Sequence, residues 1–375
     1  MRFVIPCYWV KKGRVGGGEH MLYNLVCGLA SQGNDLTLKC SKETDLAEQF
    51  RAALVQHPNV RIVEGGIPGP RFLSEQWQCF GLHAEADVTL FTNYFTPPVL
   101  PRRMGKVVTI IHDMHYRHFP QTFRFRKRLW LRGAYRVTLK RADRVVLISQ
   151  EVYHDFIRVY GEQYREKLAV IYNPVSWDRF GKVEESEHPL AGEPYLLCVA
   201  AHYPHKNLDT LIRAFAVLKE RFADIKLVMV GQLAKQLAGD SDFPSTIGQL
   251  IEELSLGAHV VVTGYVSENE LGQWYRHASA FVYPSLFEGF GMPPVEALGL
   301  GIPTVTTSCA PLPEVTLGRC LYVEQGRNVH EWVLVLEELL RHPDKYRVST
   351  ETQQLIRAKY CIQTIARQYM AVCSS

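Results

Sequence analysis

The sequence predicts an α/β protein of two doubly wound domains, and three observations lead to this prediction. First, short apolar runs alternate along the chain with longer segments of helical periodicity. Second, the alternation stops at a polar segment with two prolines, residues 179–194, and then starts again. Third, the apolar runs are continuous, which is typical of parallel strands buried on both faces. A chain of 375 residues is long enough for two domains of ordinary size.

The first half of the chain, residues 1–178, contains seven candidate strands. They are expected at residues 2–6, 35–39, 60–63, 88–91, 107–111, 144–149 and 169–172. Helical segments separate them, for example residues 18–33. Parallel strands with helical crossovers form a doubly wound, Rossmann-like domain.

The second half, residues 195–359, repeats this pattern after the segment 179–194, which is interpreted as a linker. Its strands are expected at residues 195–200, 225–230, 259–263, 280–283, 303–307 and 320–323. A last helix, at residues 360–374, has no strand after it. Two such domains favour a ligand at the interface between them.

Composition excludes several classes of protein. The chain has 47% hydrophobic and 21% charged residues, as globular proteins do, and no run of 18 apolar residues that would predict a membrane span. The N-terminal stretch MRFVIPCYW is better interpreted as a first strand than as a signal peptide. Nine scattered cysteines without a CxxC pair indicate reduced thiols and a cytoplasmic location. The net charge of +4 does not indicate a nucleic-acid partner.

The stretch PSLFEGFGMPPVEALGLG, residues 284–301, carries two glutamates that are eight positions apart, Glu288 and Glu296. It follows a predicted strand, so it lies at the sheet edge where open α/β sheets bind ligands. Its glycines allow backbone amides to approach an anion, and Pro293 and Pro294 suit the first turn of a helix. Each carboxylate could then accept a hydrogen bond from a sugar hydroxyl. The alternative is that Glu296 only caps a helix and Glu288 is a surface acid.

Other polar residues also follow predicted strands. His112 and Asp113 follow the strand at 107–111, and Lys206 and Asn207 follow the strand at 195–200. Each has an ordinary interpretation as well: a satisfied loop pair, a solvated lysine and an asparagine that caps the next helix. The glycines at 16–18 lack the full GxGxxG fingerprint, which argues against a dinucleotide-dependent oxidoreductase.

Together these segments resemble the retaining GT-B glycosyltransferases, and closely glycosyltransferase family 4. The acidic stretch is similar to the family's E-x7-E signature. The matching segments are residues 15–26, 109–120, 170–175, 201–215 and 262–291. The resemblance covers nearly the whole chain and implies a GT-B fold, two Rossmann-like domains facing each other across a cleft, with the last helix, 360–375, crossing back to the first domain.

The resemblance also implies site residues. Glu288 is expected on the transferred hexose, Glu296 on the ribose of the nucleotide, and Lys206 on the diphosphate as it leaves. His112 is expected to reach the donor sugar or the acceptor. Further donor-binding positions are Gly17, Gly18, Tyr265, Val266, Phe290, Gly291 and Met292. No metal or other cofactor is implied. Ala201 stands where many relatives carry a second cation, an arginine, so the origin of that charge stays open.

The function that follows from the resemblance is retaining transfer of a hexose from a nucleotide sugar to a glycan or lipid-linked acceptor in surface-polysaccharide assembly. GDP-mannose is the favoured donor. The alternatives are a UDP-hexose-dependent transferase, a nucleotide-sugar 2-epimerase, and a non-catalytic protein that binds sugar nucleotides.

Residues 101–144 are strongly basic, with thirteen Lys or Arg and only two acids. A stripe at i, i+4 spacing runs along the predicted helix within 124–144, and apolar residues are interleaved with it. The stripe is Arg124, Arg128, Arg132, Arg136 and Lys140, and the interleaved residues are Phe125, Leu129, Trp130 and Leu131. The helix either rests on anionic lipid headgroups, which would make the protein peripheral on the inner face of the membrane, or presents a solvated basic face. No recognition motif for nucleic acid accompanies the charge.

Overall fold

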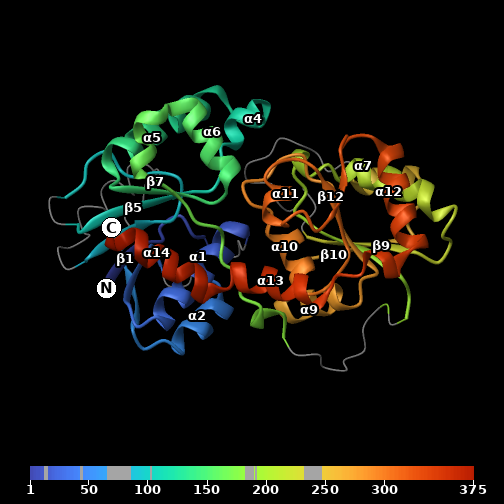
Figure 1. The fold of residues 1–375 in the computed structure, drawn as a ribbon, viewed down its shortest axis with the longest axis horizontal. Helices are drawn as coiled ribbons and strands as arrows, with labels where there is room; N and C mark the ends of the chain where they lie inside the picture. The colour runs from blue at the N-terminus through green and yellow to red at the C-terminus, as the bar shows by residue number, and fades with distance from the viewer. Residues whose placement is uncertain are drawn as a thin grey trace. The chain divides into compact units, whose positions relative to one another are not determined.

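A computed structural model describes residues 1–11, 16–42, 45–65, 86–101, 104–181, 190, 192–231 and 247–375. The chain forms two compact units, Met1–Ser176 with Lys359–Ser375, and Trp177–Ala358 (Figure 1). Each unit is an α/β body around a parallel sheet, which confirms the predicted fold class. The predicted linker, 179–194, lies partly outside the described residues, and its first residues belong to the second unit.

The first unit contains a seven-stranded sheet in the order β3-β2-β1-β4-β5-β6-β7, with every pairing parallel. Its strands are β1 (Arg2–Pro6), β2 (Asp35–Cys40), β3 (Val60–Glu64), β4 (Val88–Phe91), β5 (Lys106–Ile111), β6 (Arg144–Leu147) and β7 (Leu168–Val170). Strand β6 ends two residues before its predicted end, because Ser149 is already the N-cap of the next helix and accepts a hydrogen bond from the Val152 amide.

Helices cover both faces of this sheet (Figure 1). They are α1 (Gly17–Ser31), α2 (Glu48–Val55), α4 (His115–His118), α5 (Phe125–Arg141), α6 (Gln150–Tyr160) and α14 (Ile362–Ser374), with the 3-10 segments η2 (Pro120–Thr122) and η3 (Glu162–Lys167). The last helix, α14, packs against α1 at Gly28. A Cβ at Gly28 would lie 2.6 Å from the carbonyl oxygen of Ile362, so only glycine allows this approach.

The second unit contains a six-stranded parallel sheet in the order β10-β9-β8-β11-β12-β13. Its strands are β8 (Tyr195–Val199), β9 (Lys226–Val230), β10 (Val260–Gly264), β11 (Ala280–Tyr283), β12 (Thr304–Thr307) and β13 (Leu321–Val323). The order reverses between β8 and β11, so the loops after these two strands leave the same edge of the sheet side by side. Such a switch point is where open α/β sheets bind ligands.

The helices of the second unit complete its layers. They are α7 (Leu208–Lys219), α8 (Ile247–Glu253), α9 (Glu268–Arg276), α10 (Met292–Gly299), α11 (Leu312–Val315), α12 (Val329–Arg341) and α13 (Thr350–Tyr360), with η4 (Asp178–Phe180), η5 (Pro204–Lys206) and η7 (Pro343–Tyr346). Helices α7 and α12 pack together, and the fully buried Trp332 of α12 belongs to the core that they share with the sheet. Within the described ranges of both units, no helix is long and apolar enough to cross a membrane.

Candidate active site

Lys206 and Glu288, which are 82 residues apart in the sequence, form an ion pair at the switch point of the second sheet. Lys206 ends η5, after β8, and Glu288 lies in the loop after β11. The Lys206 Nζ lies 2.6 Å from Glu288 Oε1 and 2.8 Å from the hydroxyl oxygen of Tyr283. Both charged side chains are nearly buried, at 14% and 11% exposure. The pair is therefore held between two loops that the strand order brings together.

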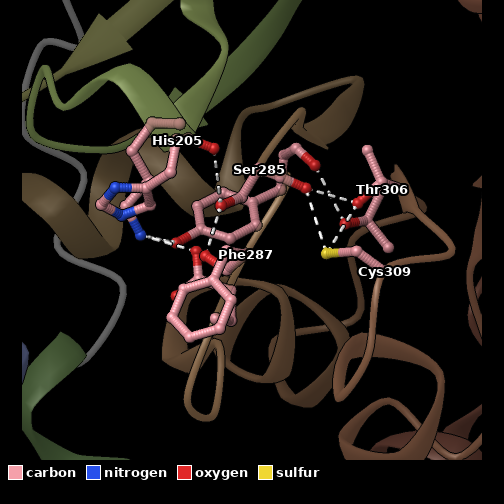
Figure 2. A network of polar contacts seen from close by, with 9 residues as sticks. His205, Ser285, Phe287, Thr306 and Cys309 are labelled. Carbon is pink, nitrogen blue, oxygen red and sulfur yellow. Dashed lines mark hydrogen bonds and ion pairs between the residues drawn. The ribbon is translucent and has the colours of Figure 1, made fainter. Parts of the chain in front are cut away.

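The loop after β11 is held by its own backbone and by Ser285, as Figure 2 shows. The Ser285 hydroxyl lies 3.3 Å from the carbonyl oxygen of His205 and 3.0 Å from that of Phe287. The Leu286 amide donates to the same His205 carbonyl at 2.7 Å. On the other side, the Cys309 thiol donates to the Ser285 carbonyl at 3.2 Å. These contacts connect the two loops directly and fix where the Glu288 side chain begins.

Asn207, next to Lys206, also connects the loop after β8 to the loop after β11. It occupies the N-cap position of α7, as predicted, but it has a left-handed backbone (φ 55°), and its side-chain oxygen accepts no capping hydrogen bond from the helix backbone. Its buried amide donates instead to the carbonyls of Pro284 and Gly326, at 3.2 and 2.7 Å. Asn207 therefore connects the lysine loop to the glutamate loop, which the sequence did not indicate.

The charges around Glu288 favour its ionised form. Burial alone would raise the pKa of Glu288, but the charges of Lys206 and His205, and hydrogen bonds from Lys206 and Ser285, hold it below its ordinary value. Burial and the neighbouring Glu288 carboxylate raise the pKa of Tyr283 well above its ordinary value. The site thus presents a carboxylate and a lysine ammonium beside a neutral phenol.

The second acid of the motif, Glu296, lies in a separate set of contacts. It is 3% exposed within α10, its Oε1 contacts a guanidinium nitrogen of Arg179, and its Oε2 accepts a hydrogen bond from the Tyr275 hydroxyl at 3.1 Å. Its carboxylate is therefore held by two side chains that no motif in the sequence indicates. Arg179 lies in the segment predicted to be a linker, and no local pattern indicates a contact that spans 117 positions.

Between the two acids the backbone turns sharply into α10. Gly291 is the N-cap of this helix and has a φ of 92°, a region that side chains disfavour. A Cβ there would also lie 2.5 Å from Leu312 Cδ2. The flanking Phe290 and Met292 are buried, and prolines fill the first turn of α10 as predicted. Their backbone amides remain predicted donor contacts.

Tyr265 and Val266 follow β10, on the edge of the sheet. Gly264 ends this strand with a φ of 73°, and its carbonyl accepts a hydrogen bond from the Gly231 amide at 2.9 Å. Tyr265 is 56% exposed and Val266 is half-buried. The role of Tyr265 and Val266 in donor binding stays a prediction.

In the first unit, Gly17 and Gly18 are the first two residues of α1. A Cβ at Gly17 would meet nothing within 4 Å, and one at Gly18 would make only ordinary contact with the Trp9 ring, at 3.6 Å. Crowding within the unit therefore does not demand glycine at either position. The contact of Gly17 and Gly18 with the donor phosphates stays a prediction.

His112 follows β5 and is buried beside the end of β4. Its Nε2 lies 2.8 Å from the Thr92 carbonyl oxygen, which can only accept, so Nε2 carries the hydrogen. Burial lowers the pKa of His112, against the opposing effects of that carbonyl and of Asp113. The Tyr94 ring stands edge-on to the imidazole at 5.3 Å, and its hydroxyl donates to Asp113 at 3.2 Å. His112 is thus a neutral, oriented imidazole.

Both halves of the chain match families of glycosyltransferases. The model described as Glycosyltransferase Family 4 matches residues 15–179, and the model described as Glycosyl transferases group 1 matches residues 182–354. The two matches account for most of the chain. The chain belongs to glycosyltransferase family 4. This confirms the family that the motifs resemble.

Curated proteins similar to this chain include O-antigen chain mannosyltransferases. This family 4 chain is 28% identical over 314 residues to the O-antigen chain mannosyltransferase RfbU of Salmonella typhimurium, a match that covers 81% of the chain and 82% of the relative. It is also 28% identical over 223 residues to the O-antigen chain mannosyltransferase B of Escherichia coli, with 58% and 56% covered. The chain is therefore a glycosyltransferase.

Solved structures share the fold along the whole chain. HepE of Anabaena, in complex with UDP-glucose, superposes with a TM-score of 0.77 at 18% identity, over 100% of this chain and 99% of HepE. Sucrose-phosphate synthase of Thermosynechococcus elongatus gives a TM-score of 0.78 at 19% identity, over 99% and 98%. With the two parallel sheets, these likenesses confirm the GT-B fold.

Proposed function

We propose that this family 4 enzyme transfers mannose from GDP-mannose, with retention of the anomeric configuration, to a glycan or lipid-linked acceptor in the assembly of a surface polysaccharide. The mannosyl donor is supported by the two relatives that act as O-antigen chain mannosyltransferases. The observation that carries the proposal is the position of Lys206, a nearly buried cation at the switch point of the second sheet. A cation held there suits the diphosphate of a nucleotide sugar.

In this proposal the reaction breaks the bond between the sugar C1 and the diphosphate oxygen. Negative charge develops on that oxygen, and the Lys206 ammonium stabilises it without a metal ion. The acceptor oxygen bonds to C1 on the same face, and its proton passes to the leaving phosphate. Glu288 accepts hydrogen bonds from the hexose hydroxyls and holds the lysine in position before the donor arrives. The chain provides the positions and charges, and no residue attacks the sugar.

Calorimetry with GDP and with UDP, in the presence of a chelator, tests the donor assignment. The proposal expects binding of GDP, with UDP at least tenfold weaker. Preference for UDP would overturn the GDP-mannose assignment and favour a UDP-hexose donor, such as the one bound by the structural relative HepE. Binding that requires a divalent ion would contradict the metal-free mechanism. If neither nucleotide bound, the transferase site itself would be misassigned.

We also propose that helix α5 rests on anionic lipid at the cytoplasmic face of a membrane. Phe125 and Leu129 lie one turn apart on this helix and are 69% and 62% exposed, and Trp130 is 37% exposed. Exposed basic residues lie along the same helix and at its N-cap: Arg124, Arg126, Lys127, Arg132, Arg136, Lys140 and Arg141. Of the predicted stripe, only Arg128 is half-buried. Exposed apolar side chains within a basic surface are typical of helices that bind anionic membranes. Arg102 and Arg103 lie outside the described residues.

Vesicle flotation tests this second proposal. The protein should float with vesicles of phosphatidylglycerol and not with those of phosphatidylcholine, and high salt should release it. Phe125→Ser with Leu129→Ser should abolish flotation, whereas Val55→Ser, which removes another exposed apolar side chain of the first unit (83% exposed), should not. Equal flotation with both lipids, or none with either, would contradict the proposal.

A further inference from the structure

A cluster of buried charges lies where the chain enters the second unit, and the mechanism above does not use it. Its centre is Arg179 in η4, whose side chain is 11% exposed. One guanidinium nitrogen, Nη2, contacts Glu296 Oε1, and the other, Nη1, lies 3.4 Å from Glu268 Oε2. A single cation therefore holds two carboxylates, one from α9 and one from α10.

The two carboxylates need this cation. Burial raises the pKa of Glu268, Arg179 opposes this rise, and the charge of Glu296 adds to it. Two buried like charges that face each other are unfavourable unless an opposite charge lies between them. Arg179 suits this position because its planar fork can reach two acceptors at once, which a lysine ammonium cannot reproduce.

The backbone around Arg179 is clamped to the same two helices. An Arg276 guanidinium nitrogen of α9 donates to the Phe180 carbonyl at 2.5 Å, and a Cβ at Gly272 would lie 2.2 Å from that carbonyl oxygen. The Trp177 ring packs on α10, where a Cβ at Gly299 would lie 2.4 Å from it. These close approaches hold Arg179 in one place relative to Glu296.

Tyr275 completes the environment of Glu296. Its hydroxyl donates to Glu296 Oε2 at 3.1 Å, and its fully buried ring packs edge-on against Phe180 at 5.6 Å. Among the residues that the structure describes, each carboxylate oxygen of Glu296 thus has one side-chain donor. Since a carboxylate offers about four lone-pair sites, about two sites remain for other donors. Two neighbouring hydroxyls of a ribose supply two such donors.

We propose that Arg179 and Tyr275 are positioning residues for the nucleotide ribose. They hold the Glu296 carboxylate so that its two remaining acceptor sites meet the 2′- and 3′-hydroxyls. This inference rests on the proposed function, in which Glu296 binds the donor nucleotide. It adds a part of the site that lies outside the E-x7-E motif, with Arg179 from the start of the second unit and Tyr275 from α9.

Calorimetry with ribose-modified nucleotides tests the inference. The probes are GDP and 2′,3′-dideoxy-GDP, or the UDP pair if UDP binds more tightly. The wild type should bind the intact ribose roughly 10- to 100-fold more tightly than the dideoxy form. This ratio corresponds to the free energy of a hydrogen bond to a charged group. Arg179→Lys and Tyr275→Phe should reduce this preference by about fivefold to tenfold, because such bonds weaken steeply with poor geometry.

Matched controls separate positioning from general stability. Arg221→Lys alters an arginine paired with Glu337, and Tyr322→Phe removes a hydroxyl paired with Thr316, both in the same unit. Both controls should keep the full preference for ribose. Tyr275→Phe keeps the buried ring. If Arg179→Lys does not fold, the ribose preference of Tyr275→Phe alone therefore tests the inference.

Three results would count against the inference in distinguishable ways. If both test variants weaken all nucleotides equally and keep the preference, Arg179 and Tyr275 are structural only. If the wild type binds the dideoxy form as tightly as the intact one, Glu296 does not read the ribose, while nucleotide binding itself stands. If the wild type binds no nucleotide, the proposed function fails as well.

Discussion

The two glutamates of the motif have the same spacing as in the family but differ in their partners. Glu288 lies in a loop and is paired with Lys206, a point charge at the end of a neighbouring loop. Glu296 lies in a helix and is held by Arg179, whose fork also reaches Glu268. A lysine ammonium exchanges one anion for another more readily than a clamped guanidinium does. The comparison therefore distinguishes two acids. The cation beside Glu288, Lys206, can rotate to bind a ligand, whereas Arg179 holds Glu296 in one position.

The largest effect on activity should come from removing the Lys206 ammonium, the cation that can exchange Glu288 for a ligand. Lys206→Ala should lower kcat by about 10²- to 10³-fold, because stabilisation of charge in the transition state is lost. Arg213→Ala, which removes an exposed cation from α7 in the same unit, should leave kcat unchanged. Steady-state kinetics with a labelled nucleotide sugar measures both. Wild-type kcat in Lys206→Ala would remove this residue from the chemistry.

Replacing Glu288 or Glu296 with glutamine should affect stability differently in the presence of GDP. Glu288→Gln leaves Lys206 nearly buried without its counter-charge, which costs about 3–5 kcal/mol of unfolding free energy. Added GDP should restore much of that loss, since its phosphates replace the missing charge beside Lys206. In Glu296→Gln, GDP should restore little, because the proposed site has the phosphates beside Lys206 and not beside Arg179. Thermal unfolding with and without GDP checks both variants. If GDP restored the same amount of stability in both, the proposed difference between Glu288 and Glu296 would be wrong.

Acid should affect the loop pair in a defined direction. The pKa of Glu288 is lowered in the folded chain, so its unfolded form takes up protons first as pH falls. The stability contributed by Glu288 is therefore fully present above its ordinary pKa of 4.5, and is lost as pH falls below 4.5 through the folded pKa. Unfolding free energy measured from pH 7 to pH 3 should fall less steeply in Glu288→Gln than in the wild type. Parallel curves would contradict this.

The smallest effect should come from Tyr283→Phe. This change removes one hydrogen-bond partner of the Lys206 ammonium and leaves Glu288 in place. The expected loss is about 0.5–1.5 kcal/mol, or roughly two- to tenfold in kcat, as for a single hydrogen bond. A loss as large as that of Lys206→Ala would mean that Tyr283, and not Glu288, holds the lysine.

The strands and the main motif could be predicted because their signals are local. Continuous apolar runs mark buried parallel strands wherever they occur, and the observed strands lie within one or two residues of the predicted ones. Gly291 and the prolines after it predict a sharp turn at the start of α10. The juxtaposition of Lys206 with Glu288 followed from the family pattern, since neither residue alone specifies it.

The partners of Glu296 could not be predicted, because they come from distant elements. Arg179 lies in a segment whose polar, proline-containing sequence has the character of a linker. Tyr275 lies in α9 and has the pattern of an ordinary core aromatic. Only the packing of Trp177 and Phe180 on α9 and α10 brings these groups to one carboxylate. Contacts of this kind carry no periodicity or motif along the chain.

The central claim is that Lys206 binds the diphosphate of the donor. We would titrate GDP and GMP, which differ by one phosphate, into metal-free wild type and Lys206→Ala. The account predicts that the wild type prefers GDP by roughly 10- to 100-fold, as for a charge-assisted contact, and that Lys206→Ala binds both alike. If Lys206→Ala kept the full preference for GDP, the diphosphate would be held elsewhere and the claim would be wrong.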